Sequence, residues 1–278
     1  MELLNKIFIN LRCDKIWLDS DNISFFKKFG FLFKKYWAIG LNKRDIKFLD
    51  TTFVYDNQFC PVILQLYPKE ITELDKVINL SKAKNVLDIG ANIGQWGFTL
   101  KSFFPQTKIY SFEPNKVAFN ILKLNKKELR ANNWFTFHYA ISNKENIRTF
   151  YFSKSASAEG SFYMENMDQN YVRTNIQKTK VKSISLSSHN LKKLDIPNSF
   201  DLVKIDVEGA EMEVLKGLKD TKFKYLEIEV VRSRKVGITI KKVEEYFKER
   251  GMKVKLLHED FFDSTSPAGN AIFEIIIQ

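Results

Sequence analysis

A glycine-rich turn after an apolar run is the part of this 278-residue sequence best suited to bind a ligand. It reads VLDIGANIGQWG over residues 86–97, with Asp88 at the expected end of a strand and Gly90 and Gly94 in the turn. Doubly wound α/β domains hold nucleotide-type ligands where such a turn enters a helix, because glycines let the backbone come close. A second predicted strand ends at Glu113, where an acid reaches the ribose hydroxyls of an adenosine. The alternative is that the glycines only allow close packing of helix on strand.

The spacing of the turn indicates which ligand it takes. The pattern is G-x-x-x-G-x-x-G, whereas the dinucleotide fingerprint is G-x-G-x-x-G. Asp88 would repel a pyrophosphate and suits a ligand with a cationic end, such as the amino group or sulfonium of S-adenosylmethionine. Asn92 either presents its amide to this ligand or supplies turn geometry. Ala140 and Ser142 end a third predicted strand, where small residues either contact the adenine or serve packing.

Three motifs in one order give a more specific assignment. DIGANIG at 88–94, FEPN at 112–115 and KIDVEGAEMEVLKGL at 204–218 together resemble the FkbM family of S-adenosylmethionine-dependent methyltransferases. The resemblance covers about residues 71–278. It implies a class I methyltransferase fold, S-adenosylmethionine as cofactor, and O-methylation, often of sugars or secondary metabolites. The family usually has Leu-Asp near the end of the strand before KIDVEG, where this chain has Leu186-Ser187-Ser188, so no role of that aspartate is carried over.

Charged residues at the end of a later predicted strand are the candidates for chemistry. In KIDVEG, Lys204 and Asp206 share one face of the extended chain, and Glu208 follows in the turn. Two charges inside a central parallel strand cost several kcal/mol unless they are paired or functional. We expect Asp206 to accept the proton of a substrate hydroxyl or orient that hydroxyl, Lys204 to stabilise developing negative charge, and Glu208 to fix the turn. The alternative is a structural ion pair of Lys204 with Asp206 or Glu208.

Residues that could bind a metal are sparse, and no metal site is expected. The three histidines are dispersed and the two cysteines form no cluster, which argues against a transition metal. Asp206 could hold Mg²⁺, but KIDVEG by itself offers no second set of oxygen ligands. Glu229, in a later predicted strand, is a secondary candidate for the cleft. It shares a face with Glu227, and that face could equally meet solvent.

The composition narrows the class of protein. The formal net charge is +11, but lysine, asparagine, isoleucine and phenylalanine are abundant along the whole chain, so the lysines indicate a solvated surface. Because no arginine-rich tract or nucleic-acid-binding module is recognisable, a nucleic-acid partner is not expected. Two cysteines make no disulfide framework, and neither a signal peptide nor an apolar run of membrane-spanning length is recognisable. We therefore expect a cytoplasmic protein with a small-molecule or glycan acceptor.

Three functions compete at this stage. The first is O-methylation of a hydroxyl on a sugar, glycan or secondary metabolite, the second is methylation of RNA, and the third is binding of S-adenosylmethionine without catalysis. The net charge favours RNA, but base-amine methyltransferases usually carry an Asn/Asp-Pro-Pro-aromatic turn where this chain has IDVEG, and no Pro-Pro occurs. The intact Asp88, Gly90, Gly94 and Glu113 argue against a non-catalytic protein. O-methylation is therefore the leading hypothesis.

The chain divides into two parts. Residues 1–70 form an aromatic and basic extension, and residues 71–278 form the methyltransferase domain. Within the extension, FFKKFGFLFKKYW at 25–37 predicts an amphipathic helix, although Gly30 and Gly40 break the stretch and weaken a long helix. This helix either packs on the catalytic domain over the substrate cleft or makes a peripheral contact with a membrane surface.

Residues 71–278 alternate strands and helices, as an α/β, Rossmann-like domain requires. Strands are expected at 85–89, 107–112, 134–141, 147–152, 180–186, 201–206, 223–230, 252–258 and 271–277, and helices at 69–80, 94–103, 115–130, 210–219 and 239–250. A loop-rich insertion is expected at 153–179. Its segment 153–166, which contains Phe162 and Tyr163, either covers the substrate or is an ordinary surface loop. The last two strands lack a helix between them and must pair as a hairpin. The predicted fold is a mostly parallel, seven-stranded class I methyltransferase sheet with a C-terminal antiparallel hairpin.

Overall fold

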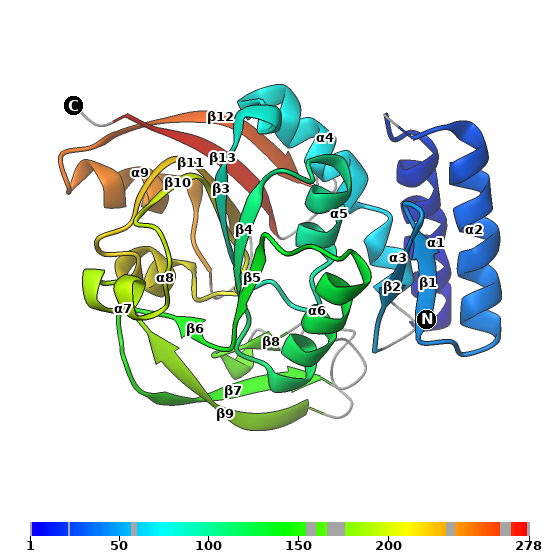
Figure 1. The fold of residues 1–278 in the computed structure, drawn as a ribbon, viewed down its shortest axis with the longest axis horizontal. Coiled ribbons are helices and arrows are strands. Elements are labelled where there is room, and N and C mark those ends of the chain that lie inside the picture. Colours follow the sequence, from blue (N-terminus) through cyan, green and yellow to red (C-terminus); the bar gives the residue numbers. More distant parts are fainter. Residues whose placement is uncertain are drawn as a thin grey trace.

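A seven-stranded sheet runs through the centre of the molecule (Figure 1). The computed structural model describes residues 2–21, 23–56, 60–153, 160–165, 176–231, 237–261 and 268–276, with the side chains of 2–9 and 261 left out. The strands of the sheet are β3 (Asn85–Ile89), β4 (Lys108–Phe112), β5 (Trp134–Phe137), β10 (Ser199–Ile205), β11 (Lys222–Val231), β12 (Lys253–Phe261) and β13 (Ala268–Ile276). Their order is β12-β13-β11-β10-β3-β4-β5, and β13 runs antiparallel to both of its neighbours. The predicted fold, with its C-terminal hairpin, is confirmed.

Helices cover both faces of the sheet because its strands are apolar on both faces. Val86 of β3 joins the core under α4 (Tyr67–Ile78), α5 (Gln95–Phe103) and α6 (Lys116–Glu128). Its neighbour Leu87 joins a second core under α7 (Ser188–Lys193), α8 (Glu211–Gly217) and α9 (Ile240–Lys248). Successive residues of a strand point to opposite faces, so one short segment anchors both helical layers. The ligand-binding turn between β3 and α5 is therefore fixed from both sides.

A smaller sheet lies beside the carboxyl ends of the central strands. It comprises β6 (Ala140–Ile141), β9 (Ile176–Ile184), β7 (Ile147–Ser153) and β8 (Gly160–Ser161), in that order. The prediction of one strand over 134–141 was wrong: β5 ends at Phe137, and Ala140 pairs with Ser183 in the smaller sheet. Between them, the ring of His138 hydrogen-bonds the carbonyl of Pro114 over 2.9 Å, which turns the chain away. Residues 154–159 and 166 of the segment expected to cover the substrate lie outside the described residues, as do 167–175 of the same insertion.

The N-terminal part of the chain builds a helical layer at one end of the molecule (Figure 1). It contains α1 (Glu2–Leu18), α2 (Phe25–Gly40), the hairpin of β1 (Asp45–Phe48) and β2 (Thr51–Val54), and α3 (Cys60–Leu64); the short helix η1 (Leu80–Lys82) follows α4. The expectation that Gly30 interrupts the second helix was wrong, because α2 runs through it and ends only at Gly40. Among the described helices, none combines the length and apolar character needed to cross a bilayer.

One buried amide joins this N-terminal layer to the ligand-binding turn. Asn125 of α6 donates through Nδ2 to the carbonyls of Val54 (2.9 Å) and Ile93 (2.8 Å). Its Oδ1 accepts from the Val54 backbone N–H over 2.7 Å. The ring of Phe53 also packs edge-on against Phe98 of α5, with centroids 5.0 Å apart. The β1–β2 hairpin is thus bound to the same helices that support the turn.

A substitution at Gly90 tests how closely the glycine turn approaches the backbone of Asp206. Its φ is +88°, and an added Cβ would overlap the carbonyl of Asp206. Gly251 also has a positive φ, +72°, but its missing Cβ faces open space. We expect Gly251→Ala to cost about 1 kcal/mol from backbone strain alone. Gly90→Ala should cost about 3 kcal/mol or more, because the backbone must also move. Denaturant unfolding of both variants measures the difference, and equal losses would contradict the close approach.

Candidate active site

A cleft at the carboxyl ends of β3, β4 and β10 gathers most of the predicted cofactor residues. Its walls include Gly90, Asn92, Glu113, Ala140, Asp206 and Glu208. The remaining walls are largely apolar and aromatic, and include Phe112, Tyr139, Ile141, Phe150, Phe162 and Val207. Of these aromatic residues, the sequence had placed Phe162 in a segment that could cover the substrate, and it had assigned no site role to Phe112, Tyr139 or Phe150. A cleft with few polar groups on apolar walls is typical of sites for small ligands.

Glu113 presents a carboxylate that the backbone holds in place. Its Oε2 accepts from the N–H of Asn92 over 2.8 Å, and its Oε1 accepts from the N–H of Asn115 over 2.7 Å. Burial raises the pKa of Glu113 to about 7, although these two hydrogen bonds act in the opposite direction. Each carboxylate oxygen can accept more than one hydrogen bond, so Glu113 retains acceptor capacity toward the cleft.

Three predicted cofactor residues lie outside the walls of the cleft. Asp88 is fully buried in β3; its Oδ2 accepts from Ser111 Oγ over 2.8 Å and its Oδ1 has no hydrogen-bond partner. At Gly94 an added Cβ would lie 2.6 Å from Cδ1 of Leu122, so this glycine lets α6 pack against the turn. Ser142 is buried and donates to Glu213 Oε2 over 2.9 Å. These three residues support the cleft from behind.

A row of buried polar residues crosses the sheet beneath the cleft. Lys204 of β10 lies level with Asp88 on β3 and with Glu227 on β11. Its side chain is 4% exposed, and its Nζ lies 3.1 Å from Oδ2 of Asp206. Burial lowers the pKa of Lys204, but the carboxylates of Asp206, Asp88 and Glu70 outweigh it and raise the pKa. The ion pair of Lys204 with Asp206, which the sequence offered as the structural alternative, is thus present, inside a cluster with more acids than one lysine balances.

A second cavity, of about 430 Å³, opens beside the cleft and is strongly acidic. The seven carboxylates on its walls are Glu70, Glu73, Asp206, Glu208, Glu227, Glu229 and Asp260. Apart from these carboxylates, the ionisable side chains on the described walls are Lys69 and His258. Ile16 of α1 and Leu74 of α4 add apolar contacts. Asp206 and Glu208 belong to the walls of both cavities. The two spaces therefore meet at the end of β10.

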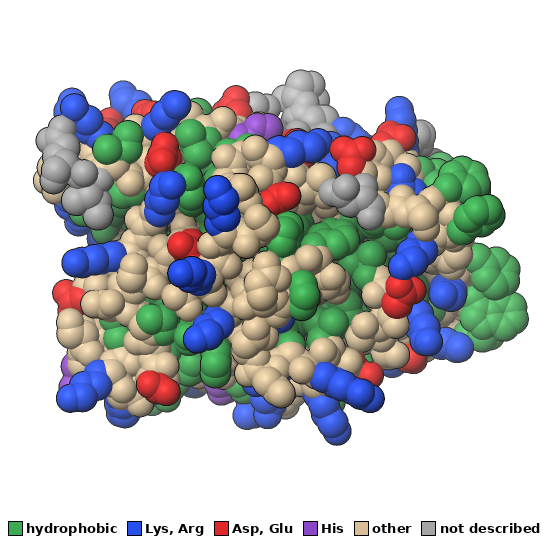
Figure 2. All heavy atoms as spheres, turned by 45° about the horizontal axis from the view of Figure 1, so that its top comes forward, with side chains coloured by type: hydrophobic (Ala, Val, Ile, Leu, Met, Phe, Trp, Pro, Cys, Tyr) green, Lys and Arg blue, Asp and Glu red, His purple; other side chains and the backbone are tan. Residues whose placement is uncertain are grey.

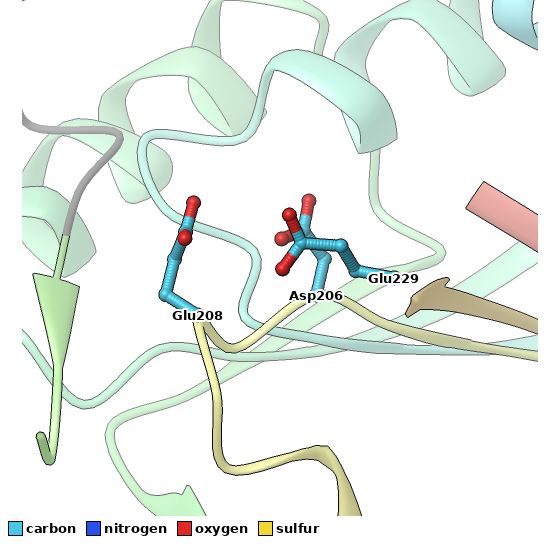
Figure 3. A group of neighbouring side chains, drawn as sticks. All are labelled: Asp206, Glu208 and Glu229. Atoms are coloured by element: carbon cyan, nitrogen blue, oxygen red, sulfur yellow. The ribbon is translucent and has the colours of Figure 1, made fainter. Parts of the chain in front are cut away.

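Three of these carboxylates come together where β10 and β11 end. One oxygen each of Asp206, Glu208 and Glu229 lies within 4.8 Å of the other two. Figure 3 shows Glu229 reaching from its strand toward Asp206, with Glu208 beside them on the loop after β10. The sequence left open whether Glu227 and Glu229 face solvent. Both line the cavity, and Glu227 is 2% exposed.

Glu70 is one of the site residues for which the sequence carried no signal. It lies in the first turn of α4, and its Oε1 is buried without a hydrogen-bond partner. Burial and the neighbouring Glu227 raise its pKa well above the ordinary value. Burial likewise raises the pKa of Glu227 to about 7, with Lys204 acting against the shift and Asp206 adding to it. The position of Glu70 depends on how α4 crosses the sheet, which no local pattern reveals.

Comparison with solved structures supports the fold alone. The crystal structure of PH0793 from Pyrococcus horikoshii aligns with a TM-score of 0.50 at 12% sequence identity. The alignment covers 89% of this chain and 85% of that protein.

Comparison with known sequences supports a family. Methyltransferase 1 of Beauveria bassiana is 28% identical over 189 residues, which cover 63% of this chain and 75% of that protein. Methyltransferase sdnD of Sordaria araneosa is 25% identical over 209 residues, covering 64% of this chain and 77% of that protein. Residues 88–254, more than half of the chain, match the model of the methyltransferase FkbM domain. The chain therefore belongs to the FkbM family of S-adenosylmethionine-dependent methyltransferases.

Proposed function

We propose that this methyltransferase acts on a hydroxyl oxygen of a sugar, a glycan or a secondary metabolite. The observation that carries the proposal is the shared wall formed by Asp206 and Glu208 between the cofactor cleft and the acidic cavity. A methyl group bound at this wall faces an acceptor held in the cavity. Carboxylates at the junction suit the removal of a proton from a hydroxyl group.

The cleft fits S-adenosylmethionine by the chemistry of its polar groups. Glu113 offers carboxylate oxygens for the ribose hydroxyls. Asn92 also lines the cleft, and its Oδ1 is buried without a hydrogen-bond partner, as expected of an acceptor that a ligand completes. Tyr139, Ile141 and Phe162 provide apolar surface for an adenine ring. Asp88 lies one layer below, so we assign it to the support of the turn.

The residues at the end of β10, where the two cavities meet, have different roles in the proposed reaction. When bound, S-adenosylmethionine supplies a methyl group that its sulfonium already activates. Asp206 accepts the acceptor's hydroxyl proton or orients that hydroxyl, and Lys204 fixes one Asp206 oxygen at 3.1 Å and stabilises negative charge. Glu208 holds the turn in shape: its φ is +50°, and its backbone carbonyl accepts from Ser161 Oγ over 2.6 Å. Orientation of the hydroxyl toward the cleft is the main contribution of the protein.

The charge of the acceptor cavity favours a hydroxyl-bearing acceptor over RNA. Carboxylates accept hydrogen bonds from hydroxyl groups but repel phosphates. Figure 2 shows Lys and Arg side chains spread over one face of the molecule, in keeping with the net charge of +11. The walls of the cavity, in contrast, are acidic. An RNA backbone would therefore bind away from the place where the methyl group is delivered. This contrast speaks against the RNA alternative.

Glu113 provides the test of cofactor binding. We expect Glu113→Ala to weaken binding of S-adenosylmethionine by about 1–3 kcal/mol, the scale of hydrogen bonds to a charged group. Isothermal titration calorimetry measures the change. Glu128→Ala, at the exposed end of α6, serves as the matched control and should bind as the natural chain does. Unchanged affinity in Glu113→Ala would remove this residue from the cofactor site.

Asp206 provides the test of the reaction. We expect Asp206→Asn to lower turnover of a hydroxyl acceptor by about 10²–10⁴-fold while cofactor affinity stays nearly constant, because the carboxylate that accepts the proton or orients the hydroxyl is lost. Asp195→Asn makes the same chemical change at an exposed loop residue and should leave turnover unaltered. Turnover and melting temperature are measured on one preparation. A fully active Asp206→Asn protein, or one that loses only thermal stability, would contradict a role in the reaction.

A further inference from the structure

We propose that Asp206, Glu208 and Glu229 bind a divalent cation of the Mg²⁺ class at the acceptor end of the site. One oxygen of each lies within 4.8 Å of the others, and the three come from two strand ends and one loop (Figure 3). Carboxylate oxygens are the ligands that Mg²⁺ and Mn²⁺ prefer. The KIDVEG motif lacks a second set of oxygen ligands, and β11 supplies it.

The register of the sheet explains why these groups meet. Asp206 follows Lys204 by two residues and Glu229 follows Glu227 by two, and Lys204 lies level with Glu227. Because side chains two apart share a face, Asp206 and Glu229 are neighbours directly above the buried row. The backbone of two parallel strands thus fixes the pair.

A separate observation points to a missing positive group. Glu227 is 2% exposed, it lines the same cavity, and its Oε2 has no hydrogen-bond partner. Oε1 of Glu70, across the cavity on α4, is also buried without a partner. A buried carboxylate oxygen is costly unless a donor or cation satisfies it. Lys204 is already 3.1 Å from Asp206, and a cation in the cavity would add positive charge beside these two acids.

The consequence for the reaction rests on the proposed O-methylation. A cation at these carboxylates holds the oxygen of the acceptor hydroxyl and lowers its pKa. The O–H bond breaks, the proton leaves to water in the cavity, and the electron pair stays on the oxygen that attacks the methyl carbon. The carbon–sulfur bond then breaks and its electrons neutralise the sulfonium. Asp206 orients the hydroxyl through the cation in this arrangement.

Cation binding is measured directly, without cofactor or acceptor, by titrating the full chain with Mn²⁺ and following its electron paramagnetic resonance. We expect one bound Mn²⁺ that Mg²⁺ displaces, and an affinity at least about tenfold lower in Glu229→Gln. Glu73→Gln removes one charge from the same cavity outside the three ligands and should retain affinity within about threefold. If Glu229→Gln does not fold, Glu208→Gln on the loop replaces it.

The outcomes separate this inference from the proposed function. Absence of Mn²⁺ binding, or equal weakening by Glu73→Gln and Glu229→Gln, overturns the cation site even if a hydroxyl acceptor is methylated. Mn²⁺ binding that depends on Glu229 supports the site even if no hydroxyl acceptor is found.

A second inference comes from the outer face of α2. Six aromatic side chains there are largely exposed: Phe25, Phe26, Phe29, Phe33, Tyr36 and Trp37. Phe26 is 86% exposed and Phe33 is 72% exposed. Figure 2 shows hydrophobic side chains standing out at this end of the molecule. An aromatic surface of this extent marks an interaction site in a folded protein.

The opposite face of α2 is firmly anchored, so the aromatic face is free to bind. Phe31 and Ala38 are buried, and Lys35 is buried in an ion pair with Asp14 of α1. The helical repeat places Lys34 beside the aromatic arc, and the β1 residue Lys47 lines the same depression as Phe33 and Trp37. A second copy of the chain would bring these lysines together. We infer that this face docks on an anionic lipid surface, where aromatic rings insert and lysines meet headgroups.

Sedimentation of the full chain with lipid vesicles tests the docking face. We expect binding to phosphatidylcholine vesicles that contain phosphatidylglycerol, weakened by added salt. The double variant Phe26→Ser/Phe33→Ser should bind at least about tenfold less. Ile147→Ser removes an equally exposed apolar side chain from β7 and should bind as before. Absence of vesicle binding, or self-association that the double variant abolishes, would overturn the inference.

Discussion

The buried ammonium group of Lys204 is the charge on which the site depends. It lies in the central strand β10, level with Asp88 on one side and Glu227 on the other, and its partner Asp206 lies at the strand end. Without it, the carboxylates of neighbouring strands would meet in the core with no cation among the residues of that row. The lysine therefore allows acidic residues to lie at the carboxyl ends of the parallel strands. Those acids form the wall between the two cavities.

The charge of the acceptor cavity is opposite in sign to the net charge of the chain. Lysines make the chain basic overall, yet the cavity beside the cofactor cleft is lined by seven carboxylates. A basic exterior and an acidic interior serve different contacts: the exterior suits anionic surfaces, and the interior suits hydroxyl groups and cations. Our proposal for the substrate class therefore starts from the charge of the cavity and not from the net charge of the chain.

Much of the catalytic fold could be predicted because its signals are local. The alternation of strands and helices and the glycine turn predicted the central sheet. The parity of Lys204 and Asp206 predicted that they share a face, with an ion pair between them as the alternative to a catalytic role. Other features depend on contacts distant in sequence. Glu70 enters the site through the packing of α4, the strand expected at 134–141 divides between two sheets, and Gly30 stays helical because α1 supports α2. Local sequence patterns do not reveal these contacts, because each one joins segments that are far apart in the sequence.

The amide of Asn125 gives the N-terminal layer a significance beyond its own stability. The same Nδ2 group binds the carbonyl of Val54 in the β1–β2 hairpin and that of Ile93 in the glycine turn. A displacement of the hairpin must break one of these bonds or carry the turn with it. The hairpin and the turn are thus coupled through Asn125. A truncation that removes the hairpin leaves the turn without this stabilising contact. The N-terminal layer is thereby a structural support of the glycine turn.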